Sequence, residues 1–217
     1  MKAIELTETG GPEVMYLREI PTPTPKQDEV LIRLAVTGVN FIDLYVREGR
    51  YRNKLPFTPG QEAAGTVVAV GKSVPHLHEG DRVAWCSILG TYAEYAVAPA
   101  ERVVPIPTGL SFEQAAAALL QGMTAHYLSH SAYPIQPGDE VLIHAGAGGT
   151  LYVTRPVLRD YTLTRNELVD RATDVFQAIV SGALKLRIER TYSLSEAAQA
   201  HRDLESRKTA GKLLLLP

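Results

Sequence analysis

The sequence predicts an α+β fold that is mainly β, in which many short strands form a barrel or a sandwich and a few helices follow. The first hundred residues contain short runs rich in Val, Ile and Tyr, and Gly and Pro separate these runs. Many short strands with glycine turns are typical of barrels and sandwiches. Helix-start signals appear after residue 110, so we expect the helices to flank the sheet in one compact domain.

The composition is that of an ordinary soluble protein, with 217 residues, 22 Lys+Arg and 24 Asp+Glu. A net charge of −2 argues against nucleic acid and anionic membranes as partners. The single cysteine, Cys86, excludes an internal disulfide framework and fits a reducing compartment, so we expect a cytoplasmic protein. Residues 1–6 alternate apolar and polar side chains, so we expect neither a signal peptide nor a membrane span there.

The strand predictions follow from runs of β-branched and aromatic residues. These runs cover residues 29–36, 66–70, 82–85, 92–97 and 102–104. Prolines at alternate positions of residues 21–25 remove backbone donors, so this stretch is expected to be an extended surface connector. A last strand is expected at residues 212–216, where the chain is a leucine run.

Two capping boxes predict where the long helices begin. Ser111 with Gln114 starts one helix that should run to about residue 128, and Thr164 with Glu167 starts another. The second helix should end at Gly182, since apolar residues recur on one face as far as that glycine. A shorter helix is expected at about residues 195–204.

A glycine-rich turn follows a buried-type run at residues 140–144 and contains Gly146, Gly148 and Gly149. Such a turn after a strand can let a backbone approach a dinucleotide pyrophosphate. The full pattern, however, needs a third glycine that opens a helix. Here residues 150–154 are strand-like and end at Arg155 and a proline, so we expect a tight turn between two strands and no intact dinucleotide fold.

Six blocks of this sequence resemble the zinc-free, zeta-crystallin-like quinone oxidoreductases of the medium-chain dehydrogenase/reductase superfamily. The blocks are residues 38–45, 57–65, 80–83, 120–125, 138–149 and 151–156. In that family a Rossmann domain of roughly a hundred residues separates the last two blocks, which here are joined directly. The resemblance therefore implies a single catalytic domain, a GroES-like partly open β-barrel with flanking helices, built from residues 1–125 and 157–217. Residues 126–156 would be a remnant strand–turn–strand where most of the Rossmann domain is missing.

The resemblance implies NADPH-dependent hydride transfer to quinones or enones, with the chemistry supplied by the cofactor. Matched by motif, the side chains that would line the catalytic cleft are those of Asn40, Asp43, Tyr45 and Tyr51. The residues that would contact NADPH are Thr124, Gly146, Gly148, Gly149, Arg155 and Lys212. Zinc is not expected, because Asn40 and Gln61 stand where the zinc-dependent relatives carry cysteine and histidine.

Several of these residues have structural interpretations as well. Asn40 and Asp43 are also typical helix-capping residues, and Tyr45 and Tyr51 can be core residues with a solvated hydroxyl. Glu62 is interpreted either as a general base or as the buried partner of a cation such as Arg82 or Arg33.

Two functional hypotheses stay open from the sequence. In one, the chain is a residual oxidoreductase whose NADPH affinity and turnover are weak because contacts to the pyrophosphate and ribose are gone. In the other, it is an inactive folded scaffold left by a natural or engineered domain deletion. Either way, apolar surface once covered by the missing domain would favour self-association.

Overall fold

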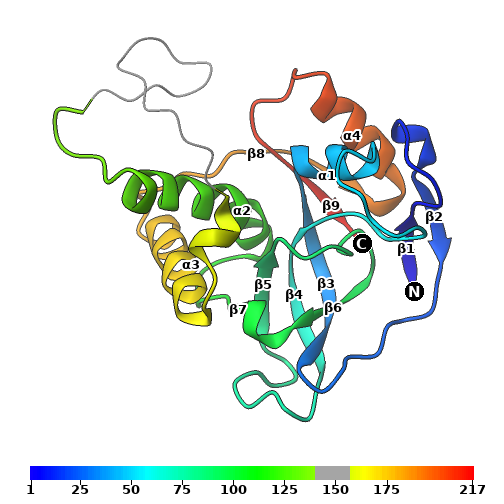
Figure 1. The fold of residues 1–217 in the computed structure, drawn as a ribbon, viewed down its shortest axis with the longest axis horizontal. Helices are drawn as coiled ribbons and strands as arrows, with labels where there is room; N and C mark the ends of the chain where they lie inside the picture. Colours follow the sequence, from blue (N-terminus) through cyan, green and yellow to red (C-terminus); the bar gives the residue numbers. More distant parts are fainter. Residues whose placement is uncertain (140–156) are drawn as a thin grey trace.

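A computed structural model of the chain describes residues 1–139 and 157–217, and its centre is a seven-stranded sheet (Figure 1). The sheet order is β7-β5-β4-β3-β9-β8, and β6 also pairs with β3. Its strands are β3 (Glu29–Val39), β4 (Glu62–Val70), β5 (Arg82–Cys86), β6 (Tyr95–Pro99), β7 (Val104–Pro105), β8 (Ile188–Ser193) and β9 (Lys212–Leu216). All pairs are antiparallel except β8 with β9. Among the described residues the sheet is not closed into a barrel. The fold is otherwise the expected α+β fold, mainly sheet with a few helices.

Strand β3 links the two halves of the chain, because it pairs with β4 and β6 from the first half and with β9 from the last residues. Gly38, near its end, allows a close approach. A Cβ there would lie 2.5 Å from Glu62 Oε2 and 2.8 Å from the Ala116 carbonyl oxygen. The missing side chain thus lets a helix and a buried carboxylate meet the strand.

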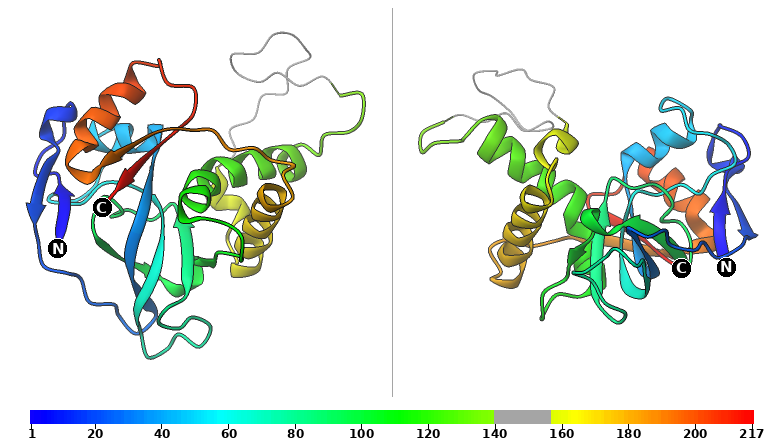
Figure 2. Two further views of the ribbon diagram at one scale, coloured as in Figure 1. Left: turned by 180° about the vertical axis from the view of Figure 1, so that it is seen from behind. Right: turned by 60° about the horizontal axis from the view of Figure 1, so that its bottom comes forward.

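Four α-helices flank the sheet: α1 (Phe41–Arg47), α2 (Phe112–Tyr127), α3 (Arg165–Val180) and α4 (Ala197–Glu205). Helices α2 and α3 pack on each other, and α2 also contacts β3, β4 and β5. Helix α4 packs against β9 on the other side, close to α1 (Figures 1 and 2). A separate two-stranded sheet of β1 (Lys2–Glu5) and β2 (Tyr16–Glu19) lies beyond α4.

Three apolar clusters hold these elements together. The first fills the space between α2, α3 and the sheet and includes Leu119, Met123 and Phe176. The second joins α4 and β9 to the N-terminal sheet, and the third lies inside β3, β4, β5 and β6 around Trp85. Burial of these side chains supplies most of the stabilisation of the fold.

The sequence predicted most elements, with several errors at their ends. Both capping boxes and the last strand are confirmed, and the expected α3 and α4 differ from the observed helices by two residues at most. The expected strand at 92–97 begins only at Tyr95, since residue Ala93 instead bridges to Ala3. The expected strand at 102–104 is wrong for its first residues, because residues 100–102 form a 3₁₀ turn.

The expected strand–turn–strand at 126–156 is wrong at its start. Helix α2 runs to Tyr127 and continues as one π-helical turn, Leu128–Ala132. The strand expected at 140–144, the glycine turn and the strand-like run after it lie outside the described residues. In the part of the chain that is described, no helix meets the length and hydropathy needed to span a bilayer.

The cap of α3 gives a first test. Thr164 Oγ1 accepts a hydrogen bond from the Glu167 backbone N–H at 3.2 Å, and the Glu167 carboxylate accepts one from the Thr164 backbone N–H at 3.0 Å. Thr164→Ala should lower the free energy of unfolding by about 1 kcal/mol in urea denaturation. Thr164→Ser keeps the hydroxyl and should unfold at nearly the parent midpoint. Equal stability of the alanine and serine variants would show that the cap contributes nothing.

Candidate active site

A buried ion pair lies where β4, β9 and the end of β3 meet. The Lys212 ammonium donates hydrogen bonds to Glu62 Oε2 and Asn40 Oδ1, both at 2.6 Å. Asn40 Nδ2 donates to the same Glu62 oxygen at 2.9 Å, and the Leu120 backbone N–H of α2 donates to Glu62 Oε1 at 2.7 Å. The Lys212 and Glu62 side chains are 3% and 0% exposed. This arrangement fixes the Asn40 carboxamide at the start of α1.

A second chain of hydrogen bonds runs from α1 to α4. Asp43 Oδ2 accepts from the Asn40 backbone N–H at 2.9 Å and from the Tyr92 hydroxyl at 3.2 Å. The Tyr92 hydroxyl lies 3.0 Å from His201 Nε2, and His201 Nδ1 lies 3.1 Å from Arg47 Nη1. The Arg47 guanidinium in turn pairs with Glu205. Asn40 thus belongs both to the ion-pair cluster and to this chain of hydrogen bonds. Together the two networks connect five separate elements of the fold.

The proton positions in the second chain follow from its donors. A guanidinium can only donate, so His201 Nδ1 accepts from Arg47 and the imidazole proton sits on Nε2. The His201 Nε2–H then donates to the Tyr92 oxygen, which leaves the tyrosine proton for Asp43. Burial, and next the positive charge of Arg47, lower the pKa of His201 to about 3, so the imidazole is neutral at pH 7.

Asp43 lies at the opposite end of this chain from Arg47. Burial raises its pKa to about 7, although the Asn40 N–H and the charge of Lys212 act in the opposite direction. Its second oxygen, Oδ1, is buried and has no hydrogen-bond partner among the residues that the structure describes. Burial also raises the pKa of Tyr92 well above its usual value, so its hydroxyl stays protonated as a donor.

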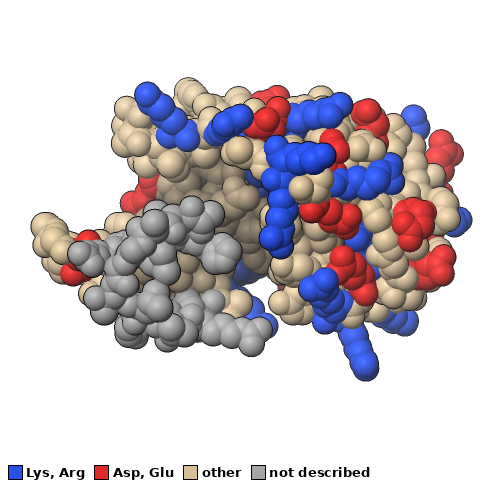
Figure 3. All heavy atoms as spheres, turned by 90° about the horizontal axis from the view of Figure 1, so that it is seen from above, with Lys and Arg blue, Asp and Glu red and all other residues tan. Residues whose placement is uncertain are grey.

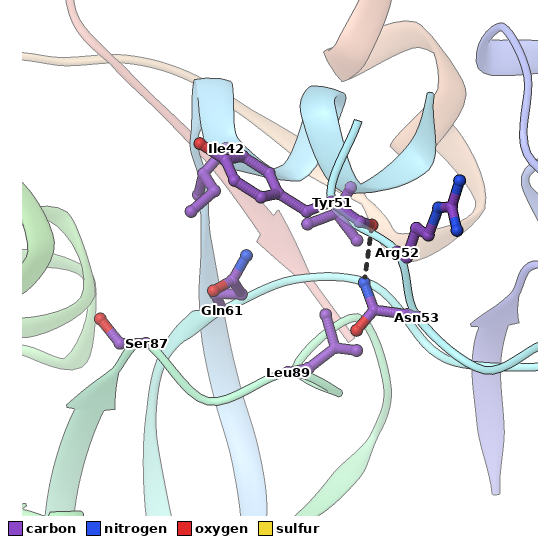
Figure 4. Close-up of a pocket in the computed structure, with 8 residues that line it drawn as sticks. Ile42, Tyr51, Arg52, Asn53, Gln61, Ser87 and Leu89 are labelled. Atoms are coloured by element: carbon purple, nitrogen blue, oxygen red, sulfur yellow. Dashed lines mark hydrogen bonds between the residues drawn. The ribbon is translucent and has the colours of Figure 1, made fainter. Parts of the chain in front are cut away.

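A pocket of about 270 Å³ opens on one side of α1 (Figure 4). Its lining residues are Ile42, Val46, Tyr51, Arg52, Asn53, Gln61, Ser87 and Leu89. The Tyr51 ring extends toward Ile42, whereas the Arg52 side chain points away from the pocket (Figure 4). Ser87 has a φ of +65°, a conformation that is uncommon for a residue with a side chain and is found at functional sites. The pocket offers an apolar surface with hydroxyl and carboxamide groups at its edge.

A larger hollow of about 380 Å³ lies between α1, α2, the α3–β8 connection and the α4–β9 loop. Its lining residues are Val39, Asn40, Phe41, Ala117, Gln121, Lys185, Leu186, Arg187, Leu204, Thr209, Ala210, Gly211 and Lys212. Seen from above, the molecule is hollowed beside a group of Lys and Arg side chains (Figure 3). The first residues of α1 therefore contribute to both spaces, since Phe41 lines the larger one and Ile42 the smaller one.

The structure brings some of the residues predicted for the site together. Asn40 and Lys212 are bonded to each other and line the larger hollow, and Asp43 is linked to them through the Asn40 backbone. Asp43 also has the expected capping role at α1. Tyr51 lines the smaller pocket and is half exposed, with its ring centroid 6.4 Å from that of Tyr45.

Other predicted residues are not brought to these spaces. The Thr124 hydroxyl donates back to the Leu120 carbonyl within α2 at 2.6 Å, and Thr124 lines neither pocket. The expected cofactor contacts at Gly146, Gly148, Gly149 and Arg155 lie outside the described residues. Glu62 is the buried partner of a cation, as one of its two interpretations expected, but the cation is Lys212 and not Arg82 or Arg33, and Arg82 donates to the Leu110 carbonyl instead.

No local sequence pattern pointed to the α4 part of the network. His201 lies in a segment expected only as a helix, and its contacts with Arg47 and Tyr92 span 154 and 109 residues of sequence. Gln121, which lines the larger hollow, belongs to a block matched to the family but received no role.

Metal ligation finds no support in the described ranges, 1–139 and 157–217, where no group of three His, Cys, Asp or Glu side chains is placed to hold an ion. Cys86 is buried, and burial raises the pKa of its thiol to about 12. It is therefore a thiol at neutral pH and not a nucleophile.

Comparison with known proteins identifies the family. Residues 26–108 match the model of the alcohol dehydrogenase GroES-like domain, and residues 138–215 match that of zinc-binding dehydrogenases. A solved mycobacterial quinone oxidoreductase is 31% identical, with a TM-score of 0.89 and full coverage of both chains. The chain belongs to the quinone oxidoreductases of the medium-chain dehydrogenase/reductase superfamily.

Two quinone oxidoreductases from Escherichia coli are also similar to this chain. The solved quinone oxidoreductase of that organism, complexed with NADPH, is 28% identical with a TM-score of 0.92, and the match covers all of both chains. "Quinone oxidoreductase 1" is 29% identical over 323 aligned residues, which cover 99% of each chain. This chain has 217 residues, so at least 106 aligned positions of the relative have no counterpart here.

Proposed function

We propose that this chain is the catalytic part of an NADPH-dependent quinone oxidoreductase, with weak cofactor binding and negligible or very slow turnover. The observation that carries the proposal is the start of α1, which contributes side chains to two adjoining spaces of different chemistry. Hydride transfer needs the donor and acceptor atoms in contact, about 3–3.5 Å apart, so in this proposal the two spaces open into each other beside Phe41 and Ile42 when both ligands are bound. NADPH supplies the hydride when it is bound.

The weak binding follows from the length of the chain. The relative aligns over 323 positions and this chain has 217 residues, which supports the loss of most of the dinucleotide-binding domain. Residues 1–125 and 157–217 would then form one catalytic domain. Charge-assisted contacts to the pyrophosphate and the adenosine ribose would be absent, and each such contact contributes substantially to affinity.

The larger hollow fits the nicotinamide end of the cofactor. Thr209 Oγ1 lines it as a buried atom without a hydrogen-bond partner, and Lys185 and Arg187 place two cations at its edge. Lys212 is a weaker candidate for a cofactor contact than the sequence suggests, because its ammonium is already bonded to Glu62 and Asn40. In this proposal Lys212 holds the Asn40 carboxamide in place.

The smaller pocket fits the quinone. Ile42, Val46 and Leu89 give an apolar surface for the ring, and Tyr51 and Gln61 carry donors for its carbonyl oxygens. Tyr51 is half exposed and free to turn toward a ligand, whereas Tyr45 is held beside the Arg50 guanidinium, 5.0 Å from its ring centroid. We therefore assign the substrate contact to Tyr51 and a supporting position to Tyr45.

An NADPH titration of three proteins tests this proposal. The parent chain should bind NADPH saturably and weakly, with a small rise in melting temperature and slow quinone-dependent NADPH oxidation. Arg155→Ala should weaken binding at least tenfold if this arginine contacts a phosphate. Arg159→Ala removes an exposed arginine four residues away and is the matched control.

The alternative is an inactive folded scaffold, and the same titration distinguishes it. A cooperative thermal transition that NADPH does not shift, with no binding to the parent chain, would end the oxidoreductase proposal. Self-association also stays a prediction. It is supported by exposed apolar side chains near the ends of α2 and α3, with Tyr133, Val157 and Leu163 between 43% and 70% exposed.

A further inference from the structure

Three polar side chains around the larger hollow have no partner among the described residues. The Gln121 carboxamide extends from α2, the Lys185 ammonium from the α3–β8 connection, and the Thr209 hydroxyl from the α4–β9 loop. Thr209 Oγ1 is buried, and burying a hydroxyl without a partner costs free energy. Gln121 and Lys185 are exposed and accessible to a ligand, and the buried Thr209 hydroxyl indicates that a ligand completes its hydrogen bond.

The chemistry of the hollow is divided between an apolar part and a cationic part. Val39, Phe41, Ala117, Leu186 and Leu204 supply apolar surface, which suits a flat ring. Lys185 and Arg187 supply positive charge on the α3–β8 connection. Arg187 is partly neutralised by Glu189, 2.8 Å away, so Lys185 is the cation that is free to bind an anion.

We propose that this hollow binds a reduced nicotinamide mononucleotide, a dihydronicotinamide riboside monophosphate, about as tightly as it binds the complete dinucleotide. The inference rests on the proposed function and specifies the part of the cofactor that this chain recognises. The ring lies on the apolar surface, Gln121 is complementary to the ring's carboxamide, and Lys185 pairs with the single phosphate. Thr209 supplies a hydroxyl for the ribose or the phosphate.

Equal binding of the half and whole cofactors follows from what surrounds the hollow. Its lining residues come from the end of β3, the start of α1, α2 and the segments from Lys185 to Lys212, and in this proposal they contact one ring, one sugar and one phosphate. The relative has at least 106 positions more than this chain. If the adenylate half of NADPH makes no contacts with the chain, it adds nothing to the affinity of the complete dinucleotide.

Isothermal titration of the full chain with three ligands tests the inference. NADPH and reduced nicotinamide mononucleotide should have dissociation constants within about threefold of each other. Dihydronicotinamide riboside, which lacks the phosphate, should bind about tenfold more weakly. Lys185→Gln should weaken both phosphorylated ligands about tenfold and leave the riboside unchanged. Lys72→Gln is the control, because Lys72 is exposed and does not line the hollow. This variant should bind all three ligands like the parent.

The outcomes separate this inference from the function on which it rests. If NADPH binds at least tenfold more tightly than the mononucleotide, adenylate contacts survive and the inference is overturned, while the proposed oxidoreductase stands. An unchanged Lys185→Gln variant would also overturn it, because the phosphate would lie elsewhere. If none of the ligands binds to the folded chain, both the inference and the proposed function fail.

Discussion

Lys212→Met is expected to lower the free energy of unfolding by about 3–5 kcal/mol. The substitution removes the cation that lies 2.6 Å from Glu62 and leaves a fully buried carboxylate. Within residues 1–139 and 157–217, the donors that would remain to Glu62 are the Asn40 amide and the Leu120 backbone N–H. Two hydrogen bonds do not compensate the desolvation of a buried charge, which is why the loss should be large. Urea denaturation monitored through Trp85 measures it.

A double variant separates this charge effect from lost packing. Glu62→Gln combined with Lys212→Met removes both charges, and it should be more stable than Lys212→Met alone. Lys208→Met is the matched control, because Lys208 is an exposed lysine in the loop that precedes β9 and has no ion pair in the described part of the chain. If Lys212→Met costs no more than the control, the pair does not stabilise the fold.

Local signals predicted the elements that depend on nearby residues. Ser111 and Thr164 mark the starts of α2 and α3 because each cap is completed within three residues of sequence. Strand β8 was missed, because only Tyr192 along it is buried and its exposed residues carry no alternating pattern. It is a strand because β9, some twenty residues later, offers it a parallel partner.

In the candidate site, too, features that depend on local motifs were predicted and contacts between distant residues were not. The motif match placed Asn40, Asp43 and Tyr51 near a cleft, and the structure puts each beside a pocket or in the buried network. The interpretation of Glu62 as the buried partner of a cation is confirmed, but the cation is Lys212 and neither Arg82 nor Arg33. Long-range contacts such as Lys212 with Glu62, 150 residues apart, leave no trace in local sequence.

The second large effect concerns pH, where two buried groups act in opposite directions. The pKa of Asp43 rises from 3.8 to about 7 on folding, so its contribution to stability is present below pH 3.8 and is lost as the pH rises to about 7. The pKa of His201 falls from 6.5 to about 3, so its contribution is present above pH 6.5 and is lost as the pH falls to about 3. Each contribution amounts to about 4–5 kcal/mol.

Between pH 4 and 6.5 these two slopes, each about 1.4 kcal/mol per pH unit, should cancel in the parent chain. Asp43→Asn, which keeps an acceptor for Asn40 and Tyr92, should therefore make stability rise with pH relative to the parent by about that slope. His201→Gln should make it fall by a similar slope, and the double variant should run parallel to the parent. Denaturation curves across this range measure the slopes independently of any uniform loss of stability. Single variants that both run parallel to the parent would show that neither group titrates abnormally in the fold, so the hydrogen-bonded chain from Asp43 to Arg47 would not have the protonation state assigned to it.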